Sequence, residues 1–158
     1  MKRIGRIIED LKGYFVEMRV LELACGDADF SLTVSKYAKS VLGVDVSLAR
    51  VEKRCLHKLA DNVQFQEMDA TQLNLEAESF DVVLTYNALG HLVGVLKDCV
   101  SEMVRVLKRG GYVMFIATWK MDRTLIPNAQ SLIATKRIMQ NTKEIESRIY
   151  RASIWKKA

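Results

Sequence analysis

Five apolar segments alternate along the chain with stretches of helical periodicity, and this alternation constrains the fold more than any other feature. The segments expected to form strands are residues 19–24, 40–46, 62–67, 80–86 and 112–118. The last two are continuous apolar runs, which is typical of strands covered on both faces. Helices are expected over residues 29–39, 47–60 and 93–108, the last one ended by Gly110 and Gly111. We therefore predict an α/β fold: a Rossmann-like, doubly wound sheet of about five parallel strands with helices on both faces.

The length of 158 residues, 49% of them hydrophobic, suits one domain with a substantial core. We expect a single domain over residues 1–158, with an N-terminal amphipathic helix up to residue 18, a ligand-binding core over 19–118 and a helical tail over 119–158. The longest apolar run, at 112–119, falls well short of the roughly 20 residues that span a membrane. The cysteines at 25, 55 and 99 show neither CxxC spacing nor a disulfide framework, so a cytoplasmic location is expected.

The net charge of +5 is concentrated in the tail. Residues 119–158 carry nine basic and three acidic side chains, a net charge of +6, so the rest of the chain is nearly neutral. A basic tail is typical either of a solvated helix face or of a surface that faces an anionic partner such as nucleic acid. From Asn128 onward the pattern predicts one long helix, after a short connection that contains Pro127.

The segment VLELACGDADF, residues 20–30, carries the main chemical signal. Glu22 lies in the expected first strand, and small residues follow at Ala24, Gly26 and Ala28. Small side chains let a ligand approach the backbone, and the helix that follows offers free N–H donors. Acids at 22, 27 and 29 would repel a pyrophosphate, so this turn favours a ligand that carries a positive charge.

Four segments in this order resemble the class I S-adenosylmethionine-dependent methyltransferases, in particular the type-11 or ubiquinone/menaquinone-biosynthesis-like group. They are VLELACGDADF, then LGVDVS at 42–47, QEMDATQL at 66–73, and FDVVLTYNALGHL together with RVLKRGGYVMFI. They cover about residues 20–118, and acids stand at 22, 45 and 69. The resemblance implies S-adenosylmethionine as the cofactor and S-adenosylhomocysteine as its product.

The resemblance also implies roles for individual residues. Glu22 would face the cofactor's ammonium group, Asp45 its ribose hydroxyls and Asp69 its adenine amino group. The other residues expected to bind the cofactor are Ala24, Cys25, Gly26, Val46, Ala70 and Asn87. Asp45 comes 23 residues after Glu22, which matches the distance at which an acid meets a ribose in βαβ nucleotide sites. The alternative for each acid is a helix cap or a solvated turn residue.

His91 is the candidate general base, because it lies just past the fourth expected strand and imidazole suits proton transfer near neutral pH. Its alternative is a packing role at the start of a helix, and His57 is a weaker candidate. Tyr14, Tyr86 and Trp119 are expected either to line an acceptor pocket or to belong to the core.

The sequence departs from the family pattern at three places. Ala28 replaces the third glycine of the first motif, and Arg109 replaces the proline that usually precedes the glycine pair. Family members also continue through a helix and an antiparallel hairpin, for which we expect no room after Thr118, although residues 148–155 could form one short strand. An acceptor half trimmed in this way suggests an exposed sheet edge, covered by a second copy or a partner subunit.

Three functions remain open from the sequence. The first is methyl transfer to a small-molecule acceptor by in-line displacement. The second is a partner subunit or remnant that binds S-adenosylmethionine without catalysing transfer, suggested by the trimmed acceptor half. The third is an RNA methyltransferase, suggested by the basic tail, although YNALGH differs from the NPPY type found where base amines are methylated.

Overall fold

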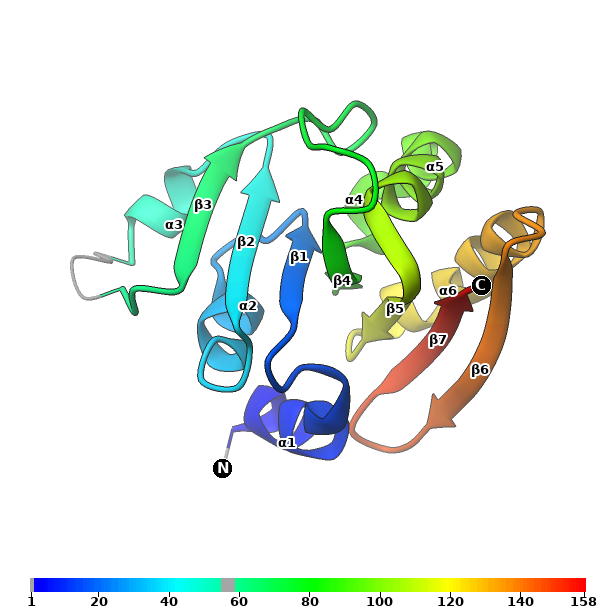
Figure 1. Ribbon diagram of the computed structural model, residues 1–158. Helices are drawn as coiled ribbons and strands as arrows, with labels where there is room; N and C mark the ends of the chain where they lie inside the picture. The colour runs from blue at the N-terminus through cyan, green and yellow to red at the C-terminus, as the bar shows by residue number, and fades with distance from the viewer. Residues whose placement is uncertain (1, 55–58) are drawn as a thin grey trace.

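The computed structural model describes residues 2–54 and 59–158 and contains one seven-stranded sheet in the order β3-β2-β1-β4-β5-β7-β6 (Figure 1). The strands are β1 (Arg19–Leu23), β2 (Ser40–Asp45), β3 (Val63–Glu67), β4 (Phe80–Tyr86), β5 (Leu107–Ala117), β6 (Met139–Glu146) and β7 (Arg151–Lys157). The α-helices are α1 (Arg3–Leu11), α2 (Asp29–Val34), α3 (Ala49–Glu52), α4 (Leu89–Leu92), α5 (Leu96–Val106) and α6 (Lys120–Ala134). Two 3-10 turns, η1 (Lys12–Tyr14) and η2 (Val93–Val95), complete the elements.

The strands β3, β2, β1, β4 and β5 are parallel to their neighbours. Their carboxyl ends therefore meet at one edge of the sheet, where ligands bind in folds of this type. The strand order changes direction at β1, whose neighbours β2 and β4 continue in opposite directions along the sheet. A crevice forms at such a switch point because the connections on its two sides leave in opposite directions.

Helices cover both faces of the sheet. One core joins α1 and α2 to the face that carries Val20, Val82 and Leu84. The other core joins α4, α5 and α6 to the face that carries Val83 and Phe115. Both faces of β4 are thus largely buried, in agreement with a sequence that is apolar except for Asp81 and Thr85.

The expectation of a long C-terminal helix without a hairpin was wrong. The strands β6 and β7 form an antiparallel pair, and β7 also pairs antiparallel with β5. The turn between them uses a serine instead of glycine: the Ser147 hydroxyl accepts hydrogen bonds from the backbone N–H groups of Ile149 and Tyr150. The spacing of Ile145, Ile149 and Ala152 looked helical, but these side chains face the core shared with α1 because the sheet places them there.

The structure also corrects the position of Pro127, which lies inside α6 and not in a connection. Proline lacks an N–H, so the carbonyl of Arg123, four residues earlier, loses its usual helical partner. Arg151 on β7 replaces that partner, since its Nη1 donates to the Arg123 carbonyl at 3.2 Å. A contact from the hairpin therefore compensates for the proline.

Several expected helix boundaries shift. The N-terminal helix ends at Leu11 and continues as η1, and the helix expected over 93–108 is divided into η2 and α5. Gly110 and Gly111 lie within β5, since α5 already ends at Val106. Of the helix expected over 47–60, the structure describes α3 only, and Cys55 and His57 lie outside the described residues. Among the described residues, no helix is both long and apolar enough to cross a membrane.

The full seven-stranded sheet removes the reason for expecting a second copy or partner subunit to cover a trimmed edge. The outer strand β6 is exposed along most of its length and carries Lys143 and Glu144, which oppose edge-to-edge pairing. Homodimerisation therefore stays a prediction from the sequence alone.

Candidate functional site

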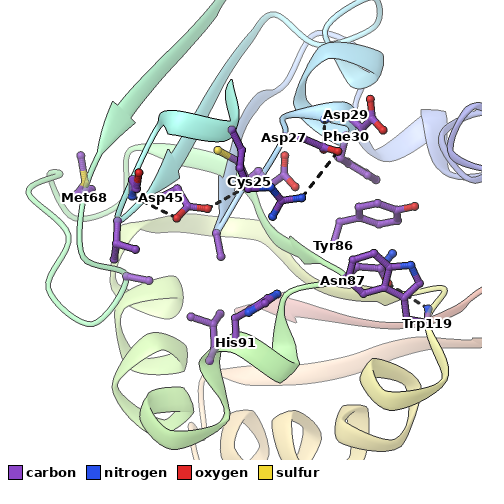
Figure 2. A pocket seen from close by; sticks show the side chains of 18 of the residues that line it. Cys25, Asp27, Asp29, Phe30, Asp45, Met68, Tyr86, Asn87, His91 and Trp119 are labelled. Atoms are coloured by element: carbon purple, nitrogen blue, oxygen red, sulfur yellow. Dashed lines mark hydrogen bonds and ion pairs between the residues drawn. The ribbon is translucent and has the colours of Figure 1, made fainter. Parts of the chain in front are cut away.

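A cavity of about 730 Å³ opens at the carboxyl ends of β1, β2 and β4 (Figure 2). All the residues that the sequence predicted to bind the cofactor line this cavity, as does the candidate base His91: Glu22, Ala24, Cys25, Gly26, Asp45, Val46, Asp69, Ala70 and Asn87. The parallel topology brings them together, because each follows or ends a neighbouring strand.

The loop between β1 and α2 has an alternating backbone. Ala24, Gly26 and Ala28 adopt left-handed conformations, with φ of 52°, 57° and 70°. Glycine adopts this conformation freely, whereas each alanine is strained by about 1–2 kcal/mol. The geometry explains why small residues recur here, and strain of this kind collects at ligand sites. Cys25 lies between them as a buried thiol whose pKa is raised by burial, which suits packing better than nucleophilic attack.

Glu22 ends up almost fully buried, with 2% of its surface exposed. Its Oε1 accepts hydrogen bonds from the Ser31 hydroxyl at 2.6 Å and from the Ser31 N–H at 3.1 Å. Burial raises the pKa of Glu22 to about 8, despite these hydrogen bonds, and the nearby charges of Asp27 and Asp45 raise it further. A positive charge placed beside a buried carboxyl group favours its ionised form. Binding of a cation there would therefore release the proton.

Asp45 lies at the end of β2, next to the loop between β1 and α2. Its Oδ2 accepts the Gly26 N–H at 2.9 Å, which fixes the loop against the second strand. The next side chain, Val46, is apolar but 75% exposed, and it lines the cavity. The Asp45 carboxylate can accept hydrogen bonds from hydroxyl groups of a ligand, and the Val46 side chain beside it can pack against a flat ring of the same ligand.

Asp69 follows β3 and forms an Asx-type turn, in which its Oδ1 accepts from the Thr71 N–H at 2.8 Å and from the Thr71 hydroxyl at 2.7 Å. These hydrogen bonds lower the pKa of Asp69. Asp69 is therefore both a turn residue and a residue that lines the cavity, next to the buried Ala70.

Asn87 connects the ends of β4 and β5. Its Oδ1 accepts from the backbone N–H groups of Thr118 at 2.7 Å and Trp119 at 3.3 Å, and its Nδ2 donates to the Thr118 hydroxyl. The residue has a left-handed backbone with φ of 50°, which asparagine tolerates better than most residues. The side chain thus builds the cavity wall, and its backbone lies where the first and fourth strands end.

His91 is exposed on α4 and lines the cavity. The turn that carries it is held by Asp122, a buried carboxylate of α6 whose Oδ1 accepts the Gly90 N–H at 2.8 Å. Tyr86 and Trp119 also line the cavity, and Tyr86 packs against the core at the same time. Tyr14 does not line it, and packs edge-on against Tyr112 with ring centroids 5.0 Å apart.

Two guanidinium groups that the sequence did not single out also line the cavity, those of Arg3 and Arg50. Arg50 lies over the loop between β1 and α2. Its Nη1 is 3.0 Å from the position that a Cβ on Gly26 would occupy, and its Nη2 is 3.9 Å from Asp27 Oδ2. Neither arginine belongs to a recognisable sequence motif, so only the three-dimensional structure identifies them as residues that line the cavity.

Comparisons with known proteins identify a family for the chain. The family described as methyltransferase domain matches residues 21–115. A phthiotriol/phenolphthiotriol dimycocerosates methyltransferase of Mycobacterium ulcerans is 33% identical over 114 residues, which cover 66% of this chain and 42% of that protein. A ubiquinone biosynthesis O-methyltransferase of Agrobacterium fabrum is 29% identical over 78% of this chain and 48% of that protein. The crystal structure of the PH0226 protein of Pyrococcus horikoshii superposes with a TM-score of 0.81 at 22% identity, covering 99% of this chain and 90% of that one.

These observations define a Rossmann-like fold with a ligand cavity at its topological switch point. The chain belongs to the methyltransferase domain family. It spans about half the length of the curated relatives it matches.

Proposed function

We propose that the chain is an S-adenosylmethionine-dependent methyltransferase domain that transfers a methyl group to a small-molecule acceptor by in-line displacement. One observation carries the proposal: the carboxylates of Glu22, Asp45 and Asp69 come from the ends of three adjacent strands and line one cavity. A structure similar in fold supports the choice of cofactor. It is the N-methyltransferase NodS of Bradyrhizobium japonicum in complex with S-adenosyl-L-homocysteine, with a TM-score of 0.76 at 16% identity, covering 98% of this chain and 85% of that one.

The residues present fit the cofactor. In the proposal, Glu22 binds the ammonium group, Asp45 accepts hydrogen bonds from the ribose hydroxyls and Val46 covers one face of the adenine. Asp69, with its second carboxylate oxygen, accepts from the adenine amino group, and the Ala70 N–H donates to the ring. The left-handed loop of Ala24, Cys25 and Gly26 gives the methionine chain close access to the backbone.

The cofactor supplies an activated methyl group on a positively charged sulfur. The protein's own contribution is then to align the acceptor behind that methyl group and to exclude water, which are effects of proximity and orientation. His91 and Trp119 line the part of the cavity where the acceptor would lie, and the backbone of Asn87 would hold the methionine end of the cofactor beside them. If the acceptor must lose a proton, His91 is placed to take it, since its exposed imidazole lines the cavity.

The two alternatives have less support. The catalytically incompetent partner subunit or remnant was suggested by a missing hairpin, and the hairpin is present. The RNA methyltransferase was suggested by the basic tail, but several of its cations are engaged within the fold. Arg123 and Arg151 both pair with Glu146, and the buried Lys157 donates to the carbonyls of Val104 and Leu107. A single-domain arrangement over 1–158 and a cytoplasmic location belong to the proposal as well.

Titration calorimetry with S-adenosylhomocysteine tests the proposed site through Asp45→Asn and a matched control, Asp61→Asn. Asp61 is an exposed carboxylate outside this cavity, so both variants lose one negative charge but only the first changes the proposed ribose contact. We expect micromolar binding for the wild type and the control, and at least tenfold weaker binding for Asp45→Asn. Equal affinities in all three proteins would contradict the assigned site.

A further inference from the structure

Four exposed apolar side chains gather beside the cavity. Val93, Val95, Trp119 and Met121, here called the apolar rim, are 53%, 44%, 53% and 69% exposed. They come from η2 and from the beginning of α6. Single exposed apolar residues are ordinary, but a group of four that includes tryptophan and methionine marks a binding surface.

The apolar rim is continuous with the cavity. Val95 and Trp119 line the cavity itself, and Met121 Sδ lies 3.5 Å from the position that a Cβ on Gly90 of α4 would occupy. On its far side, Val93 lines a second groove of about 500 Å³ between η2 and α6. Its lining is mixed, with Leu96, Pro127 and Leu132 beside Lys97, Asn128 and Ser131. The apolar rim therefore links the cavity mouth to this groove.

The two ends of the cavity differ in chemistry. Figure 2 shows Asp45 and Met68 on one side, and Tyr86, Asn87 and Trp119 on the other. The carboxylates proposed to hold the cofactor lie in the last residues of β1 and β2 and just after β3. An acceptor that enters the cavity on the Trp119 side passes over the apolar rim. The part of the acceptor that stays over the apolar rim contacts mainly carbon and sulfur atoms.

We propose that the acceptor is an amphiphile: a small polar group enters the cavity, and an attached apolar tail lies along Val93, Val95, Trp119 and Met121 toward the groove. This inference rests on the proposed function, because the polar group is taken to be the methyl acceptor. A second copy of the chain fits this surface less well. Four side chains are far fewer than the roughly 20 residues per partner in a stable protein interface, whereas their continuity with the cavity suits a tail attached to a group bound there.

The test uses 4-alkylphenols from ethyl to octyl as probes, titrated into the protein saturated with S-adenosylhomocysteine. A fully buried methylene strengthens binding about fourfold, so a methylene half covered by the apolar rim should contribute about twofold. We expect the dissociation constant to fall about 60-fold across the series. The double variant Val93→Ser/Met121→Ser should lose most of this dependence on chain length while its affinity for S-adenosylhomocysteine stays unchanged.

A matched control is Val16→Ser/Met18→Ser, which removes another exposed valine and methionine that follow η1 and do not line the cavity. This control should keep the full dependence on chain length. A flat series in the wild type, or the same slope in the apolar-rim variant as in the wild type, would overturn the proposal. So would a dimer in sedimentation analysis that Val93→Ser/Met121→Ser dissociates, because a second copy would then occupy the surface.

The same titrations separate the two proposals. Failure of S-adenosylhomocysteine to bind would reject the proposed function, whatever the phenols do. Normal binding of S-adenosylhomocysteine together with a flat phenol series would reject only the amphiphilic acceptor.

Discussion

The protonation state of Glu22 should couple cofactor binding to pH. Glu22 is 2% exposed, and burial raises its pKa to about 8, so at pH 7 about 90% of the free protein carries a proton there. The proton is expected on Oε2, because Oε1 accepts both hydrogen bonds from Ser31. If the cofactor's ammonium group binds beside Glu22, it favours the charged form, and about 0.9 proton should leave for each cofactor bound at pH 7.

The sign of the pH effect follows from this release. Affinity should rise with pH up to about 8 and then level off, and it should be about 50-fold weaker at pH 6 than at pH 8. The same group has the opposite effect on stability, which should fall as pH rises. Because the folded pKa lies above the ordinary 4.5, the folded protein binds the proton more tightly, and this contribution to the free energy of unfolding is complete below pH 4.5 and lost as pH rises through 8.

Calorimetry with S-adenosylhomocysteine in phosphate and in Tris at pH 7 measures the released proton directly, since the two buffers differ in heat of ionisation. The control is Glu22→Gln, whose amide oxygen can keep the hydrogen bonds from Ser31 but cannot release a proton. We expect a buffer-dependent heat in the wild type and none in the variant. Equal heats in both buffers for the wild type would refute the reasoning.

Three further substitutions test other contacts. Asp45→Ala should weaken S-adenosylmethionine binding by about 1–3 kcal/mol in a calorimetric titration, because charged hydrogen bonds are lost. Gly111→Ala should lower the free energy of unfolding in urea by about 1–3 kcal/mol, since its Cβ would lie 2.6 Å from the Asp81 carbonyl oxygen, whereas Gly94→Ala, with open space around it, should not. Asn87→Ala should lower the free energy of unfolding by about 1–3 kcal/mol in the same urea assay, because it removes the hydrogen bonds to the segment after β5. For either of these two variants, an unchanged urea midpoint would contradict the stability prediction.

The parallel part of the sheet and the cofactor side of the cavity could be predicted because their signals are local. β4 is apolar except for Asp81 and Thr85, and the acids at 22, 45 and 69 lie in the last residues of β1 and β2 and just after β3. Parallel topology alone then brings them together. The left-handed backbone at Ala24 and Ala28 could not be predicted in this way, since alanine is an ordinary helix former elsewhere.

The C-terminal hairpin was missed because its stability comes from distant contacts. β7 pairs with β5, as in the register of Ala152 with Ile116, and its turn depends on the Ser147 hydroxyl instead of on a glycine. Pro127 looked like a helix breaker because the Arg151 side chain that satisfies the freed carbonyl lies 24 residues away in the sequence. The apolar rim could not be predicted either. Its side chains stand out only because they are exposed to solvent, and the sequence does not show which apolar side chains are exposed.

The central claim is that the cavity is selective for S-adenosylmethionine and not for a dinucleotide. The most direct measurement is a parallel calorimetric titration of the protein with S-adenosylmethionine, S-adenosylhomocysteine and NAD. We expect micromolar binding of the first two and no binding of NAD, because the carboxylates of Asp27 and Asp29 repel a pyrophosphate at this loop. Binding of NAD, or no binding of either S-adenosyl compound, would contradict it.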